Sequence, residues 1–442
     1  MKKRLLVISA DAMVDEDLEY LSTLPNFKKY LSGGVKVKRV RSIYPTLTYP
    51  AHVSILTGCF PNKTGIVNNI VYSTDPAFND WEWDASHIRV SDIFAAAKKG
   101  GYSTAAVLWP VTGNNKNIDY LVNEIWMPHK EDTLESCFRG SGSSDEVIEI
   151  IKHNEKYLPG TYWKTGQENF AIHPIFDNFG IKCACEIIRT YKPDVFFIHT
   201  SPLDNIRHQY GIFSDKLPRE IRRIDEQIGE ICEALEDADV LEDTNIALIS
   251  DHGQMDTDRL VNVNVLLRQA GYLELKDDGT LADGWQAYCI GVGMCAYVYL
   301  GRPDNKELRD RLYAQLKAWA EAGIYGFRQV FTVEETEAAE GLGGDFSFVL
   351  ETDGYTGFGT ACEGPYVKPN SLHEDYHYAH GKHGYLPDKG PQPVFVAKGP
   401  DFASGNTLVP FCRLVDEAPT FASLLGVSMP EADGKPVLEI LK

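Results

Sequence analysis

The feature that most constrains this chain is a set of short, continuous apolar runs that have no alternation between apolar and polar residues. The three clearest are Leu5 to Ser9, the apolar centre of the expected strand Asp194 to Thr200, and Ile246 to Ser250. Such runs are typical of strands buried on both faces of a parallel sheet. Helix-like stretches separate them, at about 90–99, 172–191 and 218–235. We therefore predict an α/β fold with a mostly parallel central sheet and helices on both of its faces.

Polar side chains follow two of these runs directly. Asp11 comes after the first run, and Asp251 and His252 come after the third, with Gly253 behind them. Open parallel sheets bind their ligands along the edge formed by the carboxyl ends of the strands. We expect these side chains to share that edge, where adjacent carboxylate and imidazole groups suit a metal ion.

The stretch from Tyr44 to Gly58, YPTLTYPAHVSILTG, predicts a helix that begins near Thr48 and ends at Gly58. Free N–H groups and the helix dipole favour an anionic group at such a start. A hydroxyl nucleophile is therefore reasonable at Thr48, provided that a base or a metal ion activates it. The plain alternative is an N-cap threonine with no chemical role.

Other polar pairs are candidates of the same kind. Asp204 and His208 stand four residues apart, so on a helix both point to one side, where they could hold a metal ion or make an ordinary surface contact. Asn69, in the loop GIVNN, could donate to an oxyanion or simply form a turn. Four histidines lie in HEDYHYAHGKHGYLPD, at positions 373, 377, 380 and 383; His383, flanked by two glycines, is our candidate ligand.

Composition limits the class of protein. The chain has 442 residues, 43% of them hydrophobic, and a net charge of −20. That charge argues against a nucleic acid polymer or an anionic membrane as the main partner, because both require a basic surface. The N-terminal apolar run is too short for a membrane span. Nine scattered cysteines fit a reducing compartment, so we expect a cytoplasmic protein.

Two segments differ from the rest of the chain. We predict that residues 1–259 and 364–442 form the catalytic core and that 260–363 form an inserted cap or substrate subdomain, since that segment reads as a helix followed by antiparallel strands. Residues 112–180 are polar, aromatic and irregular, which suggests an additional excursion over the active-site face. Neither segment carries a recognisable motif.

Taken in order, the motifs resemble those of the alkaline phosphatase superfamily, and within it the type I phosphodiesterase/nucleotide pyrophosphatase family. The resemblance runs from Leu5 to about Gly434 and is weak in 112–180 and 260–363. The segments that carry it are Asp11, LTYPAH, GIVNN, DNIRH, SDHG, KHGY, VFVAKGP and DEAPTFASLLG.

The resemblance implies a site with two zinc ions, although the mixed ligands also suit Mn²⁺ or another divalent ion. One ion would be held by Asp204, His208 and His383. The other would be held by Asp11, Asp251 and His252, with Thr48 completing it as the nucleophile. Asn69 would bind a phosphoryl oxygen, and Tyr49 and Trp109 are expected to contact the substrate.

The implied activity is hydrolysis of a phosphodiester or phosphoanhydride of a small molecule, such as a nucleotide or a head-group diester, through a phosphothreonine intermediate. Because no arginine clamp for a dianionic phosphate is evident near Thr48, a diester is favoured over a monoester. The alternatives are a phosphonate hydrolase of the phosphonoacetate type, a phosphomonoester hydrolase, or a non-catalytic binding protein of the same fold. The sequence leaves the substrate and the oligomeric state open.

The chain departs from the family pattern at three places. Leu203 stands between Pro202 and Asp204, Ala51 replaces the common asparagine before His52, and Arg207 replaces the glycine before His208. Arg207 could touch an anionic substrate or lie on the surface, and we expect it on the surface.

Overall fold

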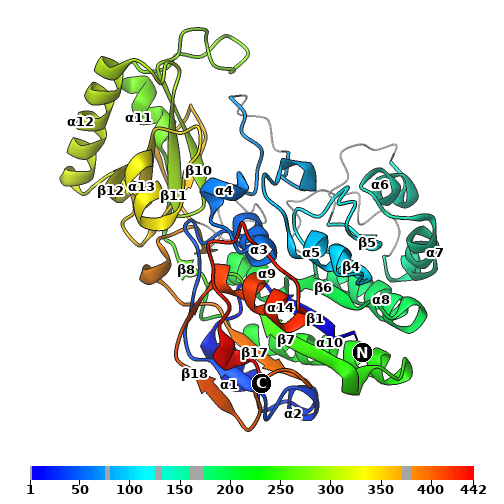
Figure 1. The fold of residues 1–442 in the computed structure, drawn as a ribbon. Coiled ribbons are helices and arrows are strands. Elements are labelled where there is room, and N and C mark those ends of the chain that lie inside the picture. The colour runs from blue at the N-terminus through cyan, green and yellow to red at the C-terminus, as the bar shows by residue number, and fades with distance from the viewer. Residues whose placement is uncertain (1, 75–79, 125–131, 159–172, 371–379) are drawn as a thin grey trace.

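The centre of the molecule is an eight-stranded sheet (Figure 1). The computed structural model describes residues 2–74, 80–124, 132–158, 173–370 and 380–442. In spatial order the strands are β18 (Thr407–Val409), β2 (Val35–Val37), β17 (Phe395–Lys398), β7 (Thr244–Ile249), β1 (Arg4–Ala10), β6 (Val195–Thr200), β4 (Thr104–Val107) and β5 (Tyr120–Val122). Neighbouring strands are parallel except where β17 pairs with β2 and β7. The predicted mostly parallel sheet is confirmed.

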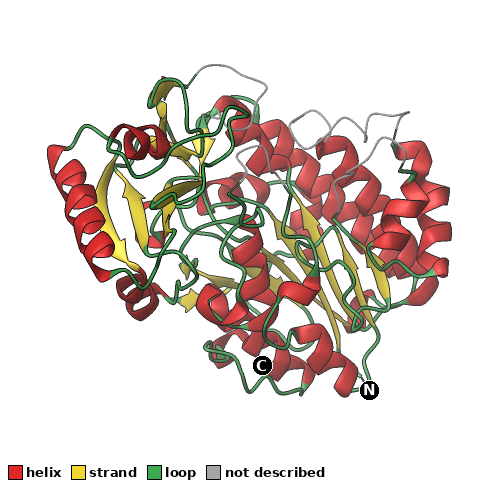
Figure 2. Ribbon diagram, turned by 90° about the horizontal axis from the view of Figure 1, so that it is seen from above, coloured by secondary structure: helices red, strands yellow, loops and turns green. Residues whose placement is uncertain are grey.

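Helices cover both faces of this sheet (Figures 1 and 2). In β1, Leu6 and Ile8 face one hydrophobic core, whereas Leu5 and Val7 face another. This alternation is the period of a strand buried on both sides. The first core is closed by α1 (Asp15–Leu21), α2 (Pro25–Tyr30), α8 (His173–Tyr191) and α10 (Leu217–Asp237), and the second by α3 (Thr48–Thr57), α5 (Ile93–Lys99) and α14 (Glu417–Leu425).

The described residues of the segment 112–180 are more regular than their sequence suggested. The segment contributes the edge strand β5 and two helices, α6 (Leu134–Gly140) and α7 (Asp145–Asn154), and it leads into α8. Val147 and Ile151 of α7 are fully buried in the core beside α8. The sequence did not indicate these elements because short amphipathic helices such as α7 depend on packing against a neighbour, which local composition does not reveal. The excursion over the active-site face stays a prediction.

The elements from β9 (Arg259–Asn262) to β15 (Val367–Pro369), which include the predicted segment 260–363, form a second body beside the central sheet (Figure 1). Its four-stranded antiparallel sheet has the order β10 (Ala287–Val292), β11 (Cys295–Leu300), β13 (Phe348–Thr352) and β12 (Phe327–Thr332). Helix α12 (Lys306–Ala322) packs on this sheet, with Leu312 and Leu316 fully buried. The other elements here are α11 (Val263–Gln269), α13 (Val333–Glu340) and a three-stranded sheet of β14 (Thr356–Gly359), β9 (Arg259–Asn262) and β15 (Val367–Pro369).

The second body packs against the segment that leads to Thr48. Tyr44 and Leu47 are buried together with Val292, Tyr297 and Val349 of the antiparallel sheet. The Tyr44 hydroxyl donates to the Glu351 carboxylate at 2.8 Å. This contact holds the segment that leads to α3 against the second body.

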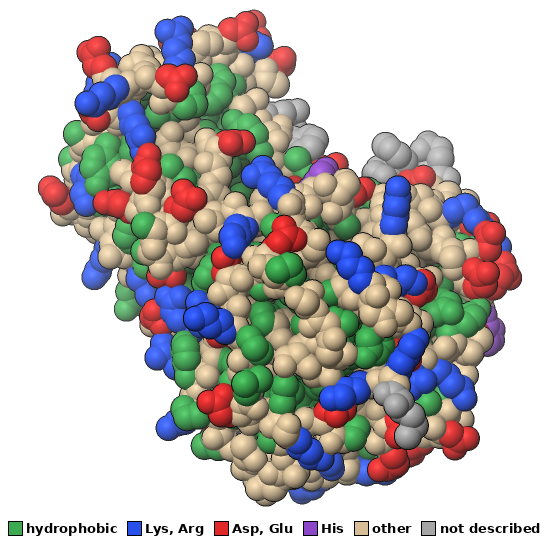
Figure 3. All heavy atoms as spheres, in the orientation of Figure 1, with side chains coloured by type: hydrophobic (Ala, Val, Ile, Leu, Met, Phe, Trp, Pro, Cys, Tyr) green, Lys and Arg blue, Asp and Glu red, His purple; other side chains and the backbone are tan. Residues whose placement is uncertain are grey.

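Figure 3 shows acidic and basic side chains interspersed over one face of the molecule. In the part of the chain that the structure describes, no helix is both long and apolar enough to cross a membrane.

Candidate active site and metal centre

The strand register brings the predicted site residues to one edge of the sheet. Ala10 of β1 lies opposite Thr200 of β6, and Ser9 lies opposite Ile249 of β7. The residues that follow these strands therefore leave the sheet side by side. Asp11 follows β1, Asp251 and His252 follow β7, and β6 leads into α9 (Pro202–Tyr210), which carries Asp204 and His208.

Thr48 begins helix α3, as the sequence indicated. It is the first helical residue after the N-cap Leu47, and Gly58 ends the helix in the left-handed conformation, with φ of 69°. The Thr48 side chain is 8% exposed. Its Oγ1 lies 3.1 Å from Nε2 of His252. The hydroxyl is thus at the positive end of a helix and beside the strand-end residues.

The first group of potential metal ligands consists of Asp11, Asp251 and His252. One ligand atom of each residue lies within 4.8 Å of the others, and all three side chains are buried. Nε2 of His252 is 3.1 Å from an Asp251 oxygen and 3.6 Å from an Asp11 oxygen. This is the set that the resemblance assigned to the Thr48 side of the site.

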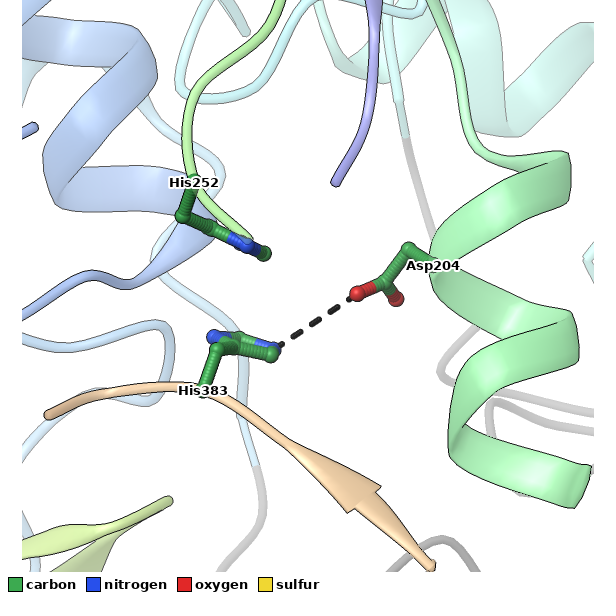
Figure 4. A group of neighbouring side chains, drawn as sticks. All are labelled: Asp204, His252 and His383. Atoms are coloured by element: carbon green, nitrogen blue, oxygen red, sulfur yellow. Dashed lines mark ion pairs between the residues drawn. The ribbon is translucent and has the colours of Figure 1, made fainter. Parts of the chain in front are cut away.

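The second group contains Asp204, His252 and His383 (Figure 4). Nε2 of His383 lies 3.7 Å from Oδ1 of Asp204, and Nε2 of His208 lies 3.3 Å from Oδ2 of Asp204. The geometry thus brings His208 to this group, as expected. It also adds His252, whose ring stacks on that of His383 with centroids 3.9 Å apart, so His252 stands between the two groups.

Backbone carbonyls orient the three imidazoles. Nδ1 of His208 donates to O of Gly381 at 2.6 Å, Nδ1 of His383 donates to O of Thr46 at 3.0 Å, and Nδ1 of His252 faces O of Gly253 at 3.2 Å. A carbonyl only accepts, so the proton resides on Nδ1 and the Nε2 lone pair points into the site. This arrangement is typical of histidines that bind metal ions.

The charges in the site are out of balance without a cation. Burial, together with the charge of Asp204, holds the pKa of Asp11 well above its usual value, and burial and Asp11 do the same for the pKa of Asp251. Burial lowers the pKa of His383 to about 4. Oδ1 of Asp11 and Oδ2 of Asp251 are buried without a hydrogen-bond partner in the structure. Neutral imidazoles beside such carboxylates fit a divalent cation, which would satisfy these oxygens.

Asn69 lies next to the nucleophile segment. It is buried, and its Oδ1 accepts the backbone N–H of Tyr49 at 2.9 Å. This bond fixes the amide group, so its nitrogen is the end that can donate to a substrate oxygen. Tyr49 itself is only 1% exposed and packs against Trp81, with ring centroids 5.2 Å apart.

The structure does not bring Trp109 to the reactive groups. Its side chain is fully buried in the core on the α3 side of the sheet, where its ring packs edge-on against His52 and Phe197. Large apolar rings at strand ends can face the core as well as the ligand edge, and the sequence offered no means to distinguish the two.

Arg207 is neither on the surface nor aimed at a substrate. It is 4% exposed, and its guanidinium donates to both carboxylate oxygens of Asp17 at 2.7 and 2.8 Å. The expectation of a surface residue was wrong, because the partner is distant in sequence. Of the His-rich stretch, His373 and His377 lie outside the described residues, and the backbone N–H of His380 donates to O of His208 at 2.9 Å.

Three further residues support the candidate ligands and were missed from the sequence. His199 on β6 places Nε2 3.2 Å from an Asp11 oxygen, and Gln254 donates to the Asp204 carboxylate. His52 donates through Nδ1 to the backbone O of Thr48 at 2.8 Å. The only sequence signal was the spacing of four residues between Thr48 and His52, which places both on one side of a helix.

Comparison with known proteins agrees with this geometry. A family model described as type I phosphodiesterase / nucleotide pyrophosphatase matches residues 5–342. Human ectonucleotide pyrophosphatase/phosphodiesterase family member 1 is 24% identical over 246 residues, which is 53% of this chain and 22% of that protein. Human bis(5'-adenosyl)-triphosphatase ENPP4 is 25% identical over 283 residues, 61% of this chain and 52% of that protein. The chain therefore spans about half, or less, of the length of these curated relatives.

Solved structures show the same fold. Murine ectonucleotide pyrophosphatase/phosphodiesterase 5 superposes with a TM-score of 0.65 at 20% identity, covering 100% of both chains. This likeness gives the alkaline phosphatase-like fold, and the family model covers well over half of the chain. The expected motifs, the fold and the family match agree, so this chain belongs to the type I phosphodiesterase/nucleotide pyrophosphatase family.

Proposed function

We propose that this chain hydrolyses a phosphodiester or phosphoanhydride bond of a small molecule, with Thr48 as the nucleophile and two zinc ions as cofactors. The observation that carries the proposal is the position of Thr48 Oγ1, 3.1 Å from His252 at the junction of the two ligand groups. A buried hydroxyl at a helix start, next to six carboxylate and imidazole side chains, matches the requirements of phosphoryl transfer.

The candidate ligands divide between the two ions. Asp11, Asp251 and His252 would hold one ion, and Asp204, His208 and His383 would hold the other, with His252 close to both. When bound, the ions would stabilise the ionised hydroxyl of Thr48 and neutralise charge on the phosphoryl and leaving oxygens. This role removes the need for a protein general base. Zinc is the proposed metal because the ligands are a mixture of nitrogen and oxygen donors.

The protein groups then carry out a double displacement. Thr48 Oγ1 loses its proton and attacks phosphorus, and the bond from phosphorus to the leaving oxygen breaks, so that the leaving group departs and takes up a proton. The phosphothreonine that forms keeps the other substituent of the substrate's phosphorus. The Asn69 amide nitrogen donates to a non-bridging oxygen, and the positive end of the α3 dipole favours the negative charge there. Water then attacks the same phosphorus, which releases the phosphate product and restores the Thr48 hydroxyl.

A nucleotide is the substrate class that the relatives favour. One relative is named a bis(5'-adenosyl)-triphosphatase. Another is described as an inactive threonine-to-alanine variant of murine ectonucleotide pyrophosphatase/phosphodiesterase 5 in complex with AMP. By analogy, we propose that this chain accepts a nucleoside phosphate with its phosphorus beside Thr48. The cytoplasmic location expected from the cysteines stays a prediction, which fractionation of the native host would test.

The test compares hydrolysis of bis-p-nitrophenyl phosphate with that of p-nitrophenyl phosphate by metal-quantified wild-type and Thr48→Ala protein. We expect preference for the diester, zinc in the wild type, and loss of at least about 10³-fold in kcat in the variant with the metal retained. Thr57→Ala is the matched control, since Thr57 lies at the other end of α3, where its hydroxyl donates to O of Val53 and accepts the N–H of Cys59. Preference for the monoester would assign a phosphatase, and an active Thr48→Ala would rule out this nucleophile.

A further inference from the structure

The buried pair of Arg207 and Asp17 joins the two halves of the site. Arg207 belongs to α9, between Asp204 and His208. Asp17 belongs to α1, which follows the Asp11 turn. Both side chains are 4% exposed, and no described residue other than Asp17 offers Arg207 an ion pair within 4.0 Å. One guanidinium therefore connects the helix of the second ligand group to the segment of the first.

The same guanidinium also holds the backbone next to Asp11. Its other terminal nitrogen donates to O of Ala12. Ala12 has φ of 58°, the left-handed region that residues other than glycine rarely adopt. Its N–H donates to Oδ1 of Asp251 at 3.1 Å. The strained turn thus directs its N–H to one candidate ligand and its carbonyl to Arg207, and this pair of bonds offsets the cost of the conformation.

Asp17 is itself fixed at the start of α1. Its Oδ2 accepts the N–H of Val14 at 2.9 Å, in addition to the two bonds from Arg207. The forked, planar guanidinium can reach two oxygens of Asp17 and the Ala12 carbonyl at once, whereas a lysine ammonium is a single point charge on a flexible stem. The two terminal nitrogens of Arg207 are thus divided between Asp17 and the Ala12 carbonyl.

We propose that Arg207 is a positioning residue that sets the separation of the two metal groups, by locking the Asp11–Ala12 turn to α9. The inference rests on the proposed function, because it assigns to Arg207 the task of holding that function's ligands. Arg207 does not touch the substrate. Its effect reaches the reaction through Asp11 and Asp251 on one side and through Asp204 and His208 on the other.

The test uses Arg207→Lys and Asp17→Asn. The first is the smallest change that removes the guanidinium, and the second is the smallest change that removes the carboxylate that binds it. We expect zinc affinity, measured by competition with a chromophoric chelator, to fall about 10- to 100-fold, which is typical of residues that support metal ligands. We expect kcat for the diester to fall by a similar factor while KM stays near the wild-type value. The double variant should lose little more than either single variant, because both changes remove one unit.

Arg413→Lys is the matched control. Arg413 makes a comparable bond to Asp416, 2.7 Å long, at the start of α14, and it does not touch the candidate ligands. It should keep wild-type zinc affinity. Wild-type zinc affinity and kcat in Arg207→Lys would overturn the inference, as would a raised KM with the metal unchanged, which would indicate a substrate contact. Zinc binding without any diesterase activity in the wild type would refute the proposed function while leaving the affinity test of Arg207 intact. A wild type that binds no zinc would refute both.

Discussion

At the scale of single residues, the informative positions are those whose two polar atoms have different tasks. Asn69 uses its carbonyl oxygen to accept the N–H of Tyr49 at 2.9 Å. Its nitrogen is the donor that we assign to the phosphoryl oxygen. A change that keeps the first task and removes the second can separate catalysis from folding.

Asn69→Asp is that change. Aspartate keeps an oxygen for Tyr49 but removes the donor and adds a negative charge, so we expect kcat for the diester to fall about 10²- to 10³-fold, as when an oxyanion donor is lost. Asn68→Asp is the control, since the Asn68 oxygen accepts the Asn69 N–H at 2.8 Å and an aspartate preserves this bond. Equal activities of the two variants would remove Asn69 from the mechanism.

A variant at Trp109 tests whether this residue is structural and not a substrate contact. Its ring is fully buried against His52 and Phe197, so Trp109→Phe should leave a cavity and lower the free energy of unfolding by about 1–3 kcal/mol. KM for the diester should stay at the wild-type value. Urea unfolding and steady-state kinetics measure the two effects. A raised KM with unchanged stability would return Trp109 to the substrate-binding residues.

The sequence identified candidate ligands where local rules were sufficient. Asp11 and Asp251 were predictable because strand ends in a parallel sheet share one edge, and Asp204 and His208 because a spacing of four residues aligns them on a helix. Arg207 was not predictable, since its partner Asp17 is 190 positions away. His252 was assigned to one metal group, whereas only the stacking on His383 reveals its place between the two groups.

At the scale of elements, α14 carries an unusual buried acid. Glu417, in the first turn of this helix, is 1% exposed, and neither of its carboxylate oxygens has a hydrogen-bond partner in the structure. Burial, with the charges of Asp416 and Asp251, raises the pKa of Glu417 well above its usual value. Burying this group in its ionised form is therefore costly.

Glu417→Gln should stabilise the protein, and more so at high pH. The pKa of such a carboxyl is higher in the folded state than in the unfolded state. The free energy of unfolding is therefore unaffected at pH values below the unfolded-state pKa, and it falls as the pH rises from there toward the folded-state pKa. The glutamine variant lacks this loss. At pH 8 we therefore expect its free energy of unfolding to exceed that of the wild type by about 1–3 kcal/mol, and at pH 5 we expect a smaller difference. Urea midpoints at the two pH values measure the difference. An equal gap at both would exclude titration of Glu417 as the cause.

Whether an element could be predicted from the sequence depends on whether its interactions are local or distant in the chain. The strands of the central sheet could be predicted because a fully buried strand has a continuous apolar run, as Leu5 to Ser9 does. Helices α6 and α7 were not predicted because they depend on packing against α8, and the polar residues that flank them are typical of loops. The antiparallel segments of 260–363 were recognised, but their contact with Tyr44, through Glu351, has no signature in the sequence.

At the scale of the whole molecule, the candidate metal centre joins parts that are distant in the chain. Asp11 comes from the end of β1, Asp204 from α9, Asp251 from the end of β7, and His383 from the segment after β16 (Gly381–Lys382). Thr46, whose carbonyl orients His383 at 3.0 Å, precedes the nucleophile helix and lies two residues from Tyr44, which the second body holds. Bound ions would cross-link all of these segments, so metal should stabilise the entire fold.

Removal of metal tests this directly. A ligand that binds only the native state at 100 times its Kd adds about 2.7 kcal/mol per site, so chelation should lower Tm by several degrees and added zinc should restore it. The effect should grow with pH for two reasons of the same sign. Without metal, the raised pKa values of Asp11 and Asp251 mean that stability is lost as pH rises, and with metal, ionised ligands bind more tightly. Thermal unfolding with chelator and with zinc, at pH 5 and pH 8, measures both. A Tm that chelation leaves unchanged at pH 8 would mean that these carboxylates and imidazoles hold no ion that the fold depends on.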